Sequence, residues 1–97
     1  MQKSDFIRAV AARSGLSQRT ARIAVDAALD EITAALRRGE PVTLTGFGTF
    51  RASERRERKG IHPHTRQPIR IPQRRTPTFS AGTDLTKAVR EESVDPI

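Results

Sequence analysis

Cysteine, tryptophan and tyrosine are absent from this 97-residue chain, and its only aromatic residues are four phenylalanines. Without cysteine, neither a disulfide nor a cysteine-based zinc site can stabilise the fold. No apolar run approaches the roughly 20 residues that span a membrane, and the first residues lack the apolar segment of a signal peptide. We therefore expect a cytoplasmic protein with no membrane partner.

The sequence also lacks the residue arrangements that catalysis requires. It has no cysteine nucleophile, no glycine-rich phosphate loop and no carboxylate pair placed with a histidine base. His62 and His64 are its only histidines, and without cysteines or nearby carboxylates they make a poor metal site. We expect a protein that is not an enzyme and that takes no cofactor, metal or small-molecule substrate.

Basic charge is abundant and is concentrated in the middle of the chain. The net charge is +7, and residues 47–80 alone hold nine basic and two acidic residues. Most of the nine are arginines, whose planar guanidinium suits phosphates and narrow grooves. An anionic membrane would also attract this charge, but no basic amphipathic helix accompanies it. Nucleic acid is therefore the better partner.

Hydrophobic spacing predicts two helices in the first half of the chain. Residues 3–13 carry apolar side chains at helical intervals, and Gly15 is expected to end that helix. Ser17 offers an N-cap for a longer helix, which Gly39 ends. We expect these two helices to form an antiparallel hairpin that the small alanines allow to pack closely.

The second half of the sequence predicts strands and a long arm. Residues 41–45 alternate as a short strand, and residues 49–59 continue as a second strand that loses its apolar side beyond Ala52. We interpret this loss as the strand leaving the body to become a basic β-ribbon arm, about residues 53–76. Its tip is expected at residues 60–67. Three prolines, at 68, 72 and 77, suit an edge ribbon, and residues 83–90 predict a final helix.

The small hydrophobic core predicts a dimer. A chain of this length buries little apolar surface, so we expect two copies to share a core. The side chains expected in that dimer core are Phe47, Phe50, Phe79, Leu29, Ile32 and Leu44. The phenylalanines could instead stack on bases, but so short a chain needs them for packing. The predicted fold class is α+β: an intertwined dimer with a helical-hairpin body, a three-stranded antiparallel sheet extended into a long β-ribbon arm, and a short C-terminal helix.

Several short motifs resemble the HU and integration host factor family of bacterial DNA-bending proteins. They are Lys3-Ser4, Gly46-Phe47-Gly48-Thr49-Phe50, Pro63 with Thr65, and Phe79-Ser80-Ala81-Gly82. The resemblance implies one HU-like DNA-binding domain over residues 1–90, followed at 91–97 by a short acidic tail that we expect to be flexible. Proteins of this family bind the minor groove and bend DNA.

The arm tip departs from the family pattern. HU proteins usually read Arg-Asn-Pro-x-Thr-Gly there, whereas residues 61–66 read Ile-His-Pro-His-Thr-Arg. Arg66 replaces a residue that tolerates positive φ, which leaves the geometry of the turn open. The proline and threonine remain in place.

Pro63 is expected to act as an intercalating wedge, because proline is rigid, apolar and has no N–H group to leave unpaired between bases. Gly82 opens a helix whose free N–H groups favour phosphate. The two histidines would gain charge in mild acid and strengthen DNA contact. The complete predicted DNA-binding set is Lys3, Arg51, Arg55, Arg56, Arg58, Lys59, Ile61, His62, Pro63, His64, Thr65, Arg66, Arg70, Arg74, Arg75 and Gly82.

The leading hypothesis is a homodimeric, nucleoid-associated protein that bends and compacts double-stranded DNA largely independently of sequence. It should prefer bent, nicked or gapped DNA, because such DNA costs less to deform. One alternative is a site-specific bender of the integration host factor type, working with or without a different partner chain. Another is a basic assembly protein that binds RNA or an acidic protein, which explains the charge but not the proline at the tip.

Overall fold

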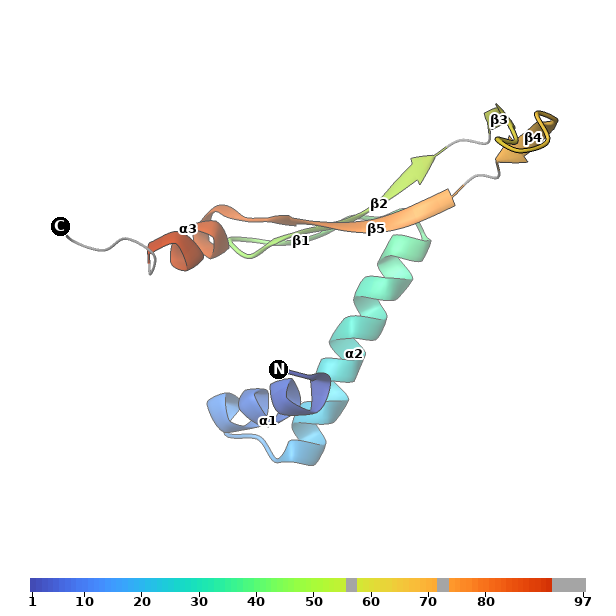
Figure 1. Ribbon diagram of the computed structural model, residues 1–97. Helices are drawn as coiled ribbons and strands as arrows, with labels where there is room; N and C mark the ends of the chain where they lie inside the picture. Colours follow the sequence, from blue (N-terminus) through green and yellow to red (C-terminus); the bar gives the residue numbers. More distant parts are fainter. Residues whose placement is uncertain (56–57, 72–73, 92–97) are drawn as a thin grey trace. The chain divides into compact units, whose positions relative to one another are not determined.

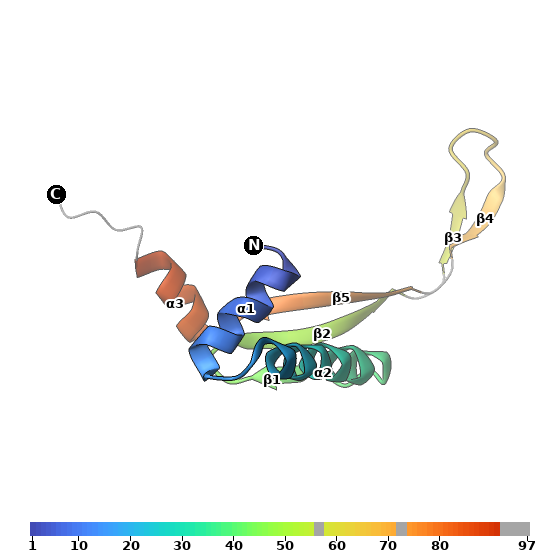
Figure 2. The same cartoon turned by 90° about the horizontal axis from the view of Figure 1, so that it is seen from below.

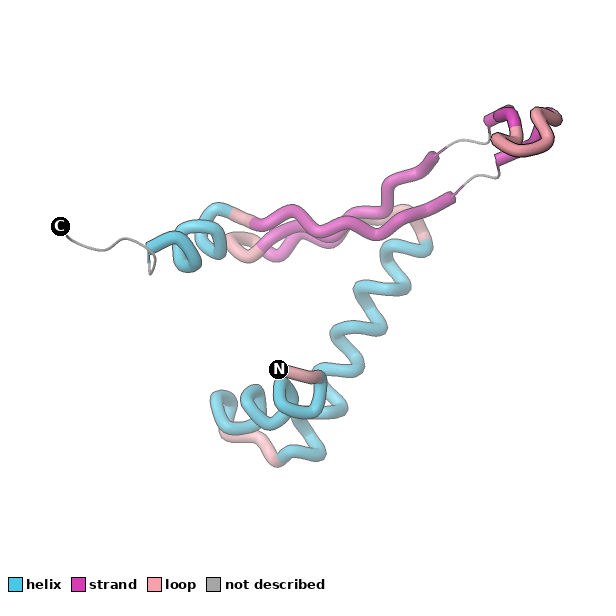
Figure 3. Tube along the Cα trace, viewed as in Figure 1, coloured by secondary structure: helices cyan, strands magenta, loops and turns pink. Residues whose placement is uncertain are grey.

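The computed structural model describes residues 1–55, 58–71 and 74–91. Its elements are, in chain order, α1 (Lys3–Ser14), α2 (Gln18–Arg37), β1 (Val42–Leu44), β2 (Gly48–Arg55), β3 (Arg58–Ile61), β4 (Pro68–Ile71), β5 (Arg74–Ala81) and α3 (Thr83–Glu91) (Figure 1, Figure 3). This order confirms the predicted α+β class. The chain divides into two units, residues 1–35 and 36–97, each with its own internal contacts.

The predicted signals bound both N-terminal helices. Gly15 follows α1 in the left-handed conformation, with φ of 75°. The Ser17 side chain then accepts a hydrogen bond from the Thr20 backbone N–H at 3.1 Å, the N-cap that the sequence predicts for α2. At the far end of α2, the N–H of Gly39 donates to the Leu36 carbonyl at 3.0 Å.

The core of the first unit lies where α1 meets α2. Ile7, Ala11, Ala21 and Val25 are buried together, and Val10 packs against them. The two helices cross steeply, as two perpendicular views show (Figure 1, Figure 2). The two helices pack together as the sequence predicts, and the small side chains of Ala11 and Ala21 lie in their shared core.

The second unit is built on a three-stranded antiparallel sheet with the strand order β1-β2-β5. The central strand β2 pairs Phe50 with Val42 on one side and with Phe79 on the other. Pro77 lies in the edge strand β5 opposite Ala52, where its missing N–H is tolerated. Strands β3 and β4 form a separate two-stranded antiparallel sheet, which we call the arm hairpin (residues 58–71).

The arm hairpin begins to pair nearer its tip than the sequence predicts. Gly60 pairs with Ile69 and Ile61 with Pro68, so the loop spans residues 62–67 and not 60–67. The difference arises because strand pairing needs only backbone groups, which Gly60 and Ile61 supply. The predicted edge proline at position 72 lies outside the described residues.

The β1–β2 turn docks onto the start of α3 through backbone hydrogen bonds. The N–H of Gly82 donates to the Phe47 carbonyl at 2.7 Å, and the N–H of Leu85 donates to the Gly46 carbonyl at 3.1 Å. Gly46 has a φ of 85°, which disfavours a side chain. The two glycine-containing motifs, 46–50 and 79–82, thus form one structural joint.

The six side chains predicted for a dimer core are not part of the core of the single chain. Leu29, Leu44, Phe47 and Phe79 are exposed, whereas Ile32 and Phe50 are half-buried. The Phe79 ring lies against those of Phe50 and Phe47, with centroids 4.8 and 5.6 Å away. These rings form a cluster that one chain leaves about half uncovered.

None of the helices in the described part of the chain has the length and apolar content needed to cross a membrane.

Candidate nucleic-acid interface

The arm hairpin gathers basic side chains and has no acidic ones. Antiparallel pairing sets Lys59 opposite Arg70, and both are exposed. No aspartate or glutamate occurs in residues 58–71. Basic residues placed opposite each other repel across a ribbon, which makes this stretch a poor structural element and a good surface for a polyanion.

The loop of the arm hairpin is closed by two backbone hydrogen bonds. The N–H of His62 donates to the Gln67 carbonyl at 2.9 Å, and the N–H of Arg66 donates to the His62 carbonyl at 2.8 Å. Arg66 adopts a φ of 55°, so it keeps the left-handed conformation for which glycine is usually chosen. An arginine in that conformation costs roughly 1–2 kcal/mol, which the surrounding hydrogen bonds must offset.

Pro63 is exposed at the tip of this loop. It follows His62, whose ring nitrogen Nδ1 accepts the backbone N–H groups of His64 at 3.2 Å and Thr65 at 3.3 Å. The rings of the two histidines lie 5.9 Å apart. The sequence predicted that His62 lies at the DNA surface, but it did not predict that the imidazole caps the N–H groups of His64 and Thr65. Polar side chains that bond to backbone groups a few residues away are nevertheless common in turns.

Most of the predicted DNA-binding set is accessible. Exposed members are Lys3, Arg51, Lys59, Ile61, Pro63, His64, Thr65, Arg66, Arg70, Arg74 and Arg75. Arg55 pairs with Arg74 through the backbone, and Arg58 pairs with Ile71. Arg56 lies outside the described residues, so its predicted role is neither supported nor opposed.

Two predicted phosphate-binding residues have partners within the chain. Lys3 forms an ion pair with Asp26, whose carboxylate oxygen lies 2.7 Å from its Nζ. Arg75 donates from Nε to Glu54 at 2.9 Å, and its guanidinium also donates to the Arg37 carbonyl at the end of α2. The side chains of Lys3 and Arg75 remain 60% and 49% exposed, and Arg75 links β5 to Glu54 of β2 and to the Arg37 carbonyl. The structure therefore gives Arg75 a structural role that the sequence did not predict.

Gly82 also has a structural explanation that competes with its predicted phosphate contact. Its N–H is already donated to Phe47, and a Cβ atom at this position would lie 2.8 Å from the Gly46 carbonyl oxygen. Glycine is thus required there by the close approach of the β1–β2 turn. The first turn of α3 also carries Asp84, whose charge opposes an incoming phosphate.

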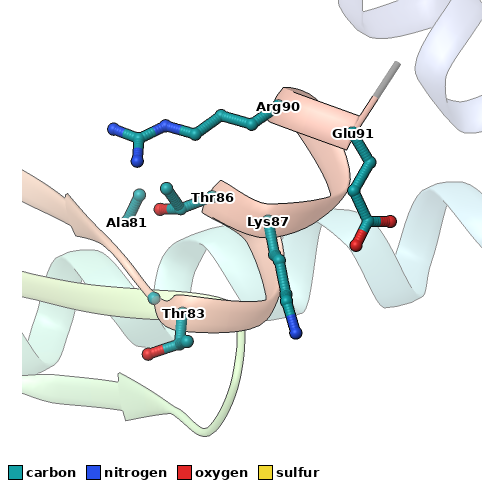
Figure 4. Close-up of a pocket in the computed structure, with 7 residues that line it drawn as sticks. Ala81, Thr83, Thr86, Lys87, Arg90 and Glu91 are labelled. Atoms are coloured by element: carbon teal, nitrogen blue, oxygen red, sulfur yellow. The ribbon is translucent and has the colours of Figure 1, made fainter. Parts of the chain in front are cut away.

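A shallow hollow of about 540 Å³ lies along α3. The Arg90 side chain extends beside Thr86 and Ala81. Lys87 also lines the hollow from α3, but its side chain points away from these three residues (Figure 4). The hollow is open to solvent. Its lining includes the hydroxyls of Thr83 and Thr86 and the carboxylate of Glu91, but no histidine.

Within residues 1–55, 58–71 and 74–91, no three histidine, aspartate or glutamate side chains come close enough to hold a metal ion.

An α+β body with a basic β-hairpin that exposes a proline defines a β-ribbon type of nucleic-acid-binding protein. Comparison with known families agrees, because the family model described as "Bacterial DNA-binding protein" matches residues 1–90. The DNA-binding protein HU of Geobacillus stearothermophilus is 48% identical over 90 residues, which cover 93% of this chain and all of that protein. HU of Haemophilus influenzae is 43% identical over the same length.

Solved structures agree with the sequence comparison. An Anabaena HU–DNA cocrystal structure matches with a TM-score of 0.75 and 38% identity, covering 99% of this chain and 100% of that one. The chain belongs to the HU family of bacterial DNA-binding proteins. Membership confirms the predicted family and makes the chain a non-enzymatic, architectural DNA-binding protein.

Proposed function

We propose that this chain forms a homodimer that bends double-stranded DNA by laying two arm hairpins in the minor groove and inserting Pro63 from each. The observation that carries the proposal is the exposed Pro63 at the end of a hairpin with basic and no acidic residues. A ribbon of this kind gains nothing by folding back on a core. It gains contacts when it follows a phosphate backbone.

The half-covered apolar side chains support the dimer. Phe47 is 49% exposed, Phe79 43% and Leu29 47%, although these residue types are normally buried. Apolar patches of this kind mark association surfaces, since burying each such side chain is worth about 1.5–3 kcal/mol. A second copy is the partner of choice, because it would supply the same uncovered rings.

The tip geometry supports a wedge. Pro63 offers an apolar ring with no N–H group, and the backbone around it is fixed by the loop hydrogen bonds. A side chain that unstacks a base step costs a few kcal/mol, which a bent duplex offsets by reaching more basic residues. Two arms in one dimer would produce two kinks.

The charge distribution supports binding with little dependence on sequence. Arginine and lysine side chains of the arm are suited to phosphates, whereas residues 58–71 hold only one amide side chain, Gln67, for base readout. Affinity should therefore fall steeply with salt as counterions are released. DNA that is already bent, nicked or gapped should bind more tightly, because its deformation is cheaper. Such a protein would be associated with the nucleoid and would compact DNA by repeated bending.

The experiment that tests this function measures the end-to-end distance of a short, doubly labelled duplex by fluorescence transfer. Wild-type protein should shorten that distance on duplexes of unrelated sequence. Pro63→Ala should largely abolish the shortening while raising Kd by less than about tenfold, or about 1.4 kcal/mol. Pro77→Ala, in the edge strand β5, is the matched control and should bend DNA normally.

Either of two results would contradict the proposal. If Pro63→Ala shortens the end-to-end distance as much as the wild-type protein does, Pro63 is not a wedge. Shortening restricted to one duplex sequence would favour a site-specific bender. Sedimentation of the free protein as a monomer at micromolar concentration would contradict the homodimer.

A further inference from the structure

We propose that His62 is the positioning residue for the wedge: its neutral imidazole accepts two backbone N–H groups and so fixes the turn that presents Pro63. This inference rests on the wedge function proposed above and adds a regulating property to it. The bend that the protein imposes on DNA should depend on the protonation of one histidine.

The hydrogen bonds of the loop show how His62 acts. Its Nδ1 atom lies 3.2 Å from the His64 nitrogen and 3.3 Å from the Thr65 nitrogen, on the chain immediately after Pro63. The backbone of His62 completes the arrangement by donating to Gln67 and accepting from Arg66. One residue therefore holds both ends of the segment that carries the proline.

The donors of the loop can be followed one by one. Pro63 has no backbone N–H. The N–H groups of His64 and Thr65 donate to Nδ1 of His62, and the N–H of Gln67 donates to the Thr65 hydroxyl at 3.4 Å. The remaining two close the loop through backbone carbonyls. Without the imidazole, the two donors beside Pro63 lose their partner inside the protein, and the turn loses the contacts that orient the proline.

Only one protonation state of the ring can make these bonds. A backbone N–H cannot accept, so Nδ1 must carry the lone pair and any ring proton must sit on Nε2. In the imidazolium both nitrogens are donors, and Nδ1–H would then face two further N–H groups. Protonation of the ring therefore removes the cap, because Nδ1 can no longer accept the two backbone N–H groups.

The neighbouring charges offer the protonated ring no compensation within the hairpin. His64 lies 5.9 Å away between ring centroids, Arg66 is bonded to the His62 carbonyl, and Lys59 and Arg70 are paired further down the ribbon. Residues 58–71 contain no carboxylate. Acidification therefore has two opposite consequences: added positive charge strengthens attraction to DNA, while the lost cap weakens presentation of the wedge.

Three variants separate this role from a simple charge contact. His62→Asn places an amide oxygen near Nδ1 and cannot titrate, His62→Ala removes the acceptor, and His64→Asn removes the neighbouring histidine, whose ring accepts neither N–H. The bend of a saturated duplex should be measured by fluorescence transfer at pH 8 and pH 5.5. Thermal unfolding should be recorded for each variant, and it should not change because the loop is exposed.

Wild-type protein and His64→Asn should bend DNA strongly at pH 8 and at least twofold less at pH 5.5. His62→Asn should bend DNA equally at both pH values, and His62→Ala should bend it weakly at both. Full bending by His62→Ala at pH 8 would overturn the positioning role. A wild-type bend that is unchanged at pH 5.5 would overturn its pH dependence.

A measurement on the free protein distinguishes failure of this inference from failure of the wedge itself. The ¹⁵N shifts of the His62 ring at pH 8 should show a protonated Nε2 and an unprotonated Nδ1. A proton on Nδ1 would overturn the cap whatever happens on DNA. If the cap is present but Pro63→Ala still bends DNA, the wedge function fails and the loop geometry stands.

Discussion

The three-stranded body sheet and the arm hairpin are both antiparallel ribbons, yet different interactions determine their structures. In the body, the Phe79 ring covers Gly48 and meets the rings of Phe47 and Phe50, and the β1–β2 turn bonds to α3. In the arm, the defining contacts are hydrogen bonds within six loop residues. The body is held by side-chain packing between distant segments, whereas the arm is held locally.

This difference matches what each region does. A packed sheet supplies the stability that a small chain needs, and its phenylalanines remain partly exposed. A ribbon with exposed basic side chains contributes little to folding, and its side chains are therefore available for DNA. Substitutions in the body should change stability first, and substitutions in the arm should change DNA bending or affinity first.

Replacing the central ring of the body should have the largest effect. Phe79→Ala removes the contacts with both other phenylalanines, and large-to-small changes of this kind cost about 3–5 kcal/mol when the site is fully packed. We expect the free energy of unfolding to fall by about 3 kcal/mol or more and the dimer to dissociate. Urea denaturation and analytical ultracentrifugation measure the two effects. A stable, fully dimeric variant would show that this ring cluster is not a shared core.

A methyl group added to a glycine should destabilise the body more than the arm, and by less than the loss of the Phe79 ring. In Gly48→Ala the new Cβ would lie 2.4 Å from the Phe79 ring and 2.6 Å from the Ser80 carbonyl oxygen, so the sheet must shift. Overpacking of this kind typically costs about 1–3 kcal/mol. Gly60→Ala makes the same change in the arm, where we expect the free energy of unfolding to change by less than about 0.5 kcal/mol. Equal losses in urea denaturation would mean that the arm is coupled to the folding of the body.

The body was largely predictable because its signals are local and chemically distinct. Gly15, Ser17 and Gly39 mark helix ends through positive φ and side-chain capping, and both features are readable from residue type. The alternating patterns also predicted the three-stranded antiparallel sheet.

Site residues were harder to predict because charge alone does not reveal a partner. Arg74 and Arg75 are neighbours with the same side chain, and nothing in the sequence separates them. The register sets Glu54 opposite Arg75, and Arg75 also bonds to the Arg37 carbonyl. Only these contacts show that Arg75, although exposed, has partners within the chain. The cap made by His62 was likewise invisible, because histidine next to a basic run is ordinarily a charge.

That pair of arginines gives the smallest effect and the most direct comparison of the two kinds of role. Arg75→Gln removes hydrogen bonds to the Glu54 carboxylate and the Arg37 carbonyl, so we expect about 0.5–1.5 kcal/mol of lost stability and a small change in DNA affinity. Arg74→Gln alters an exposed residue, so stability should stay within about 0.5 kcal/mol. If Arg74 contacts one phosphate, the slope of log affinity against log salt should fall by about 0.9. Urea denaturation and a salt titration of binding anisotropy on both variants test this. The reverse pattern, in which Arg75→Gln lowers the salt dependence and Arg74→Gln lowers stability, would show that the two roles are exchanged between these residues.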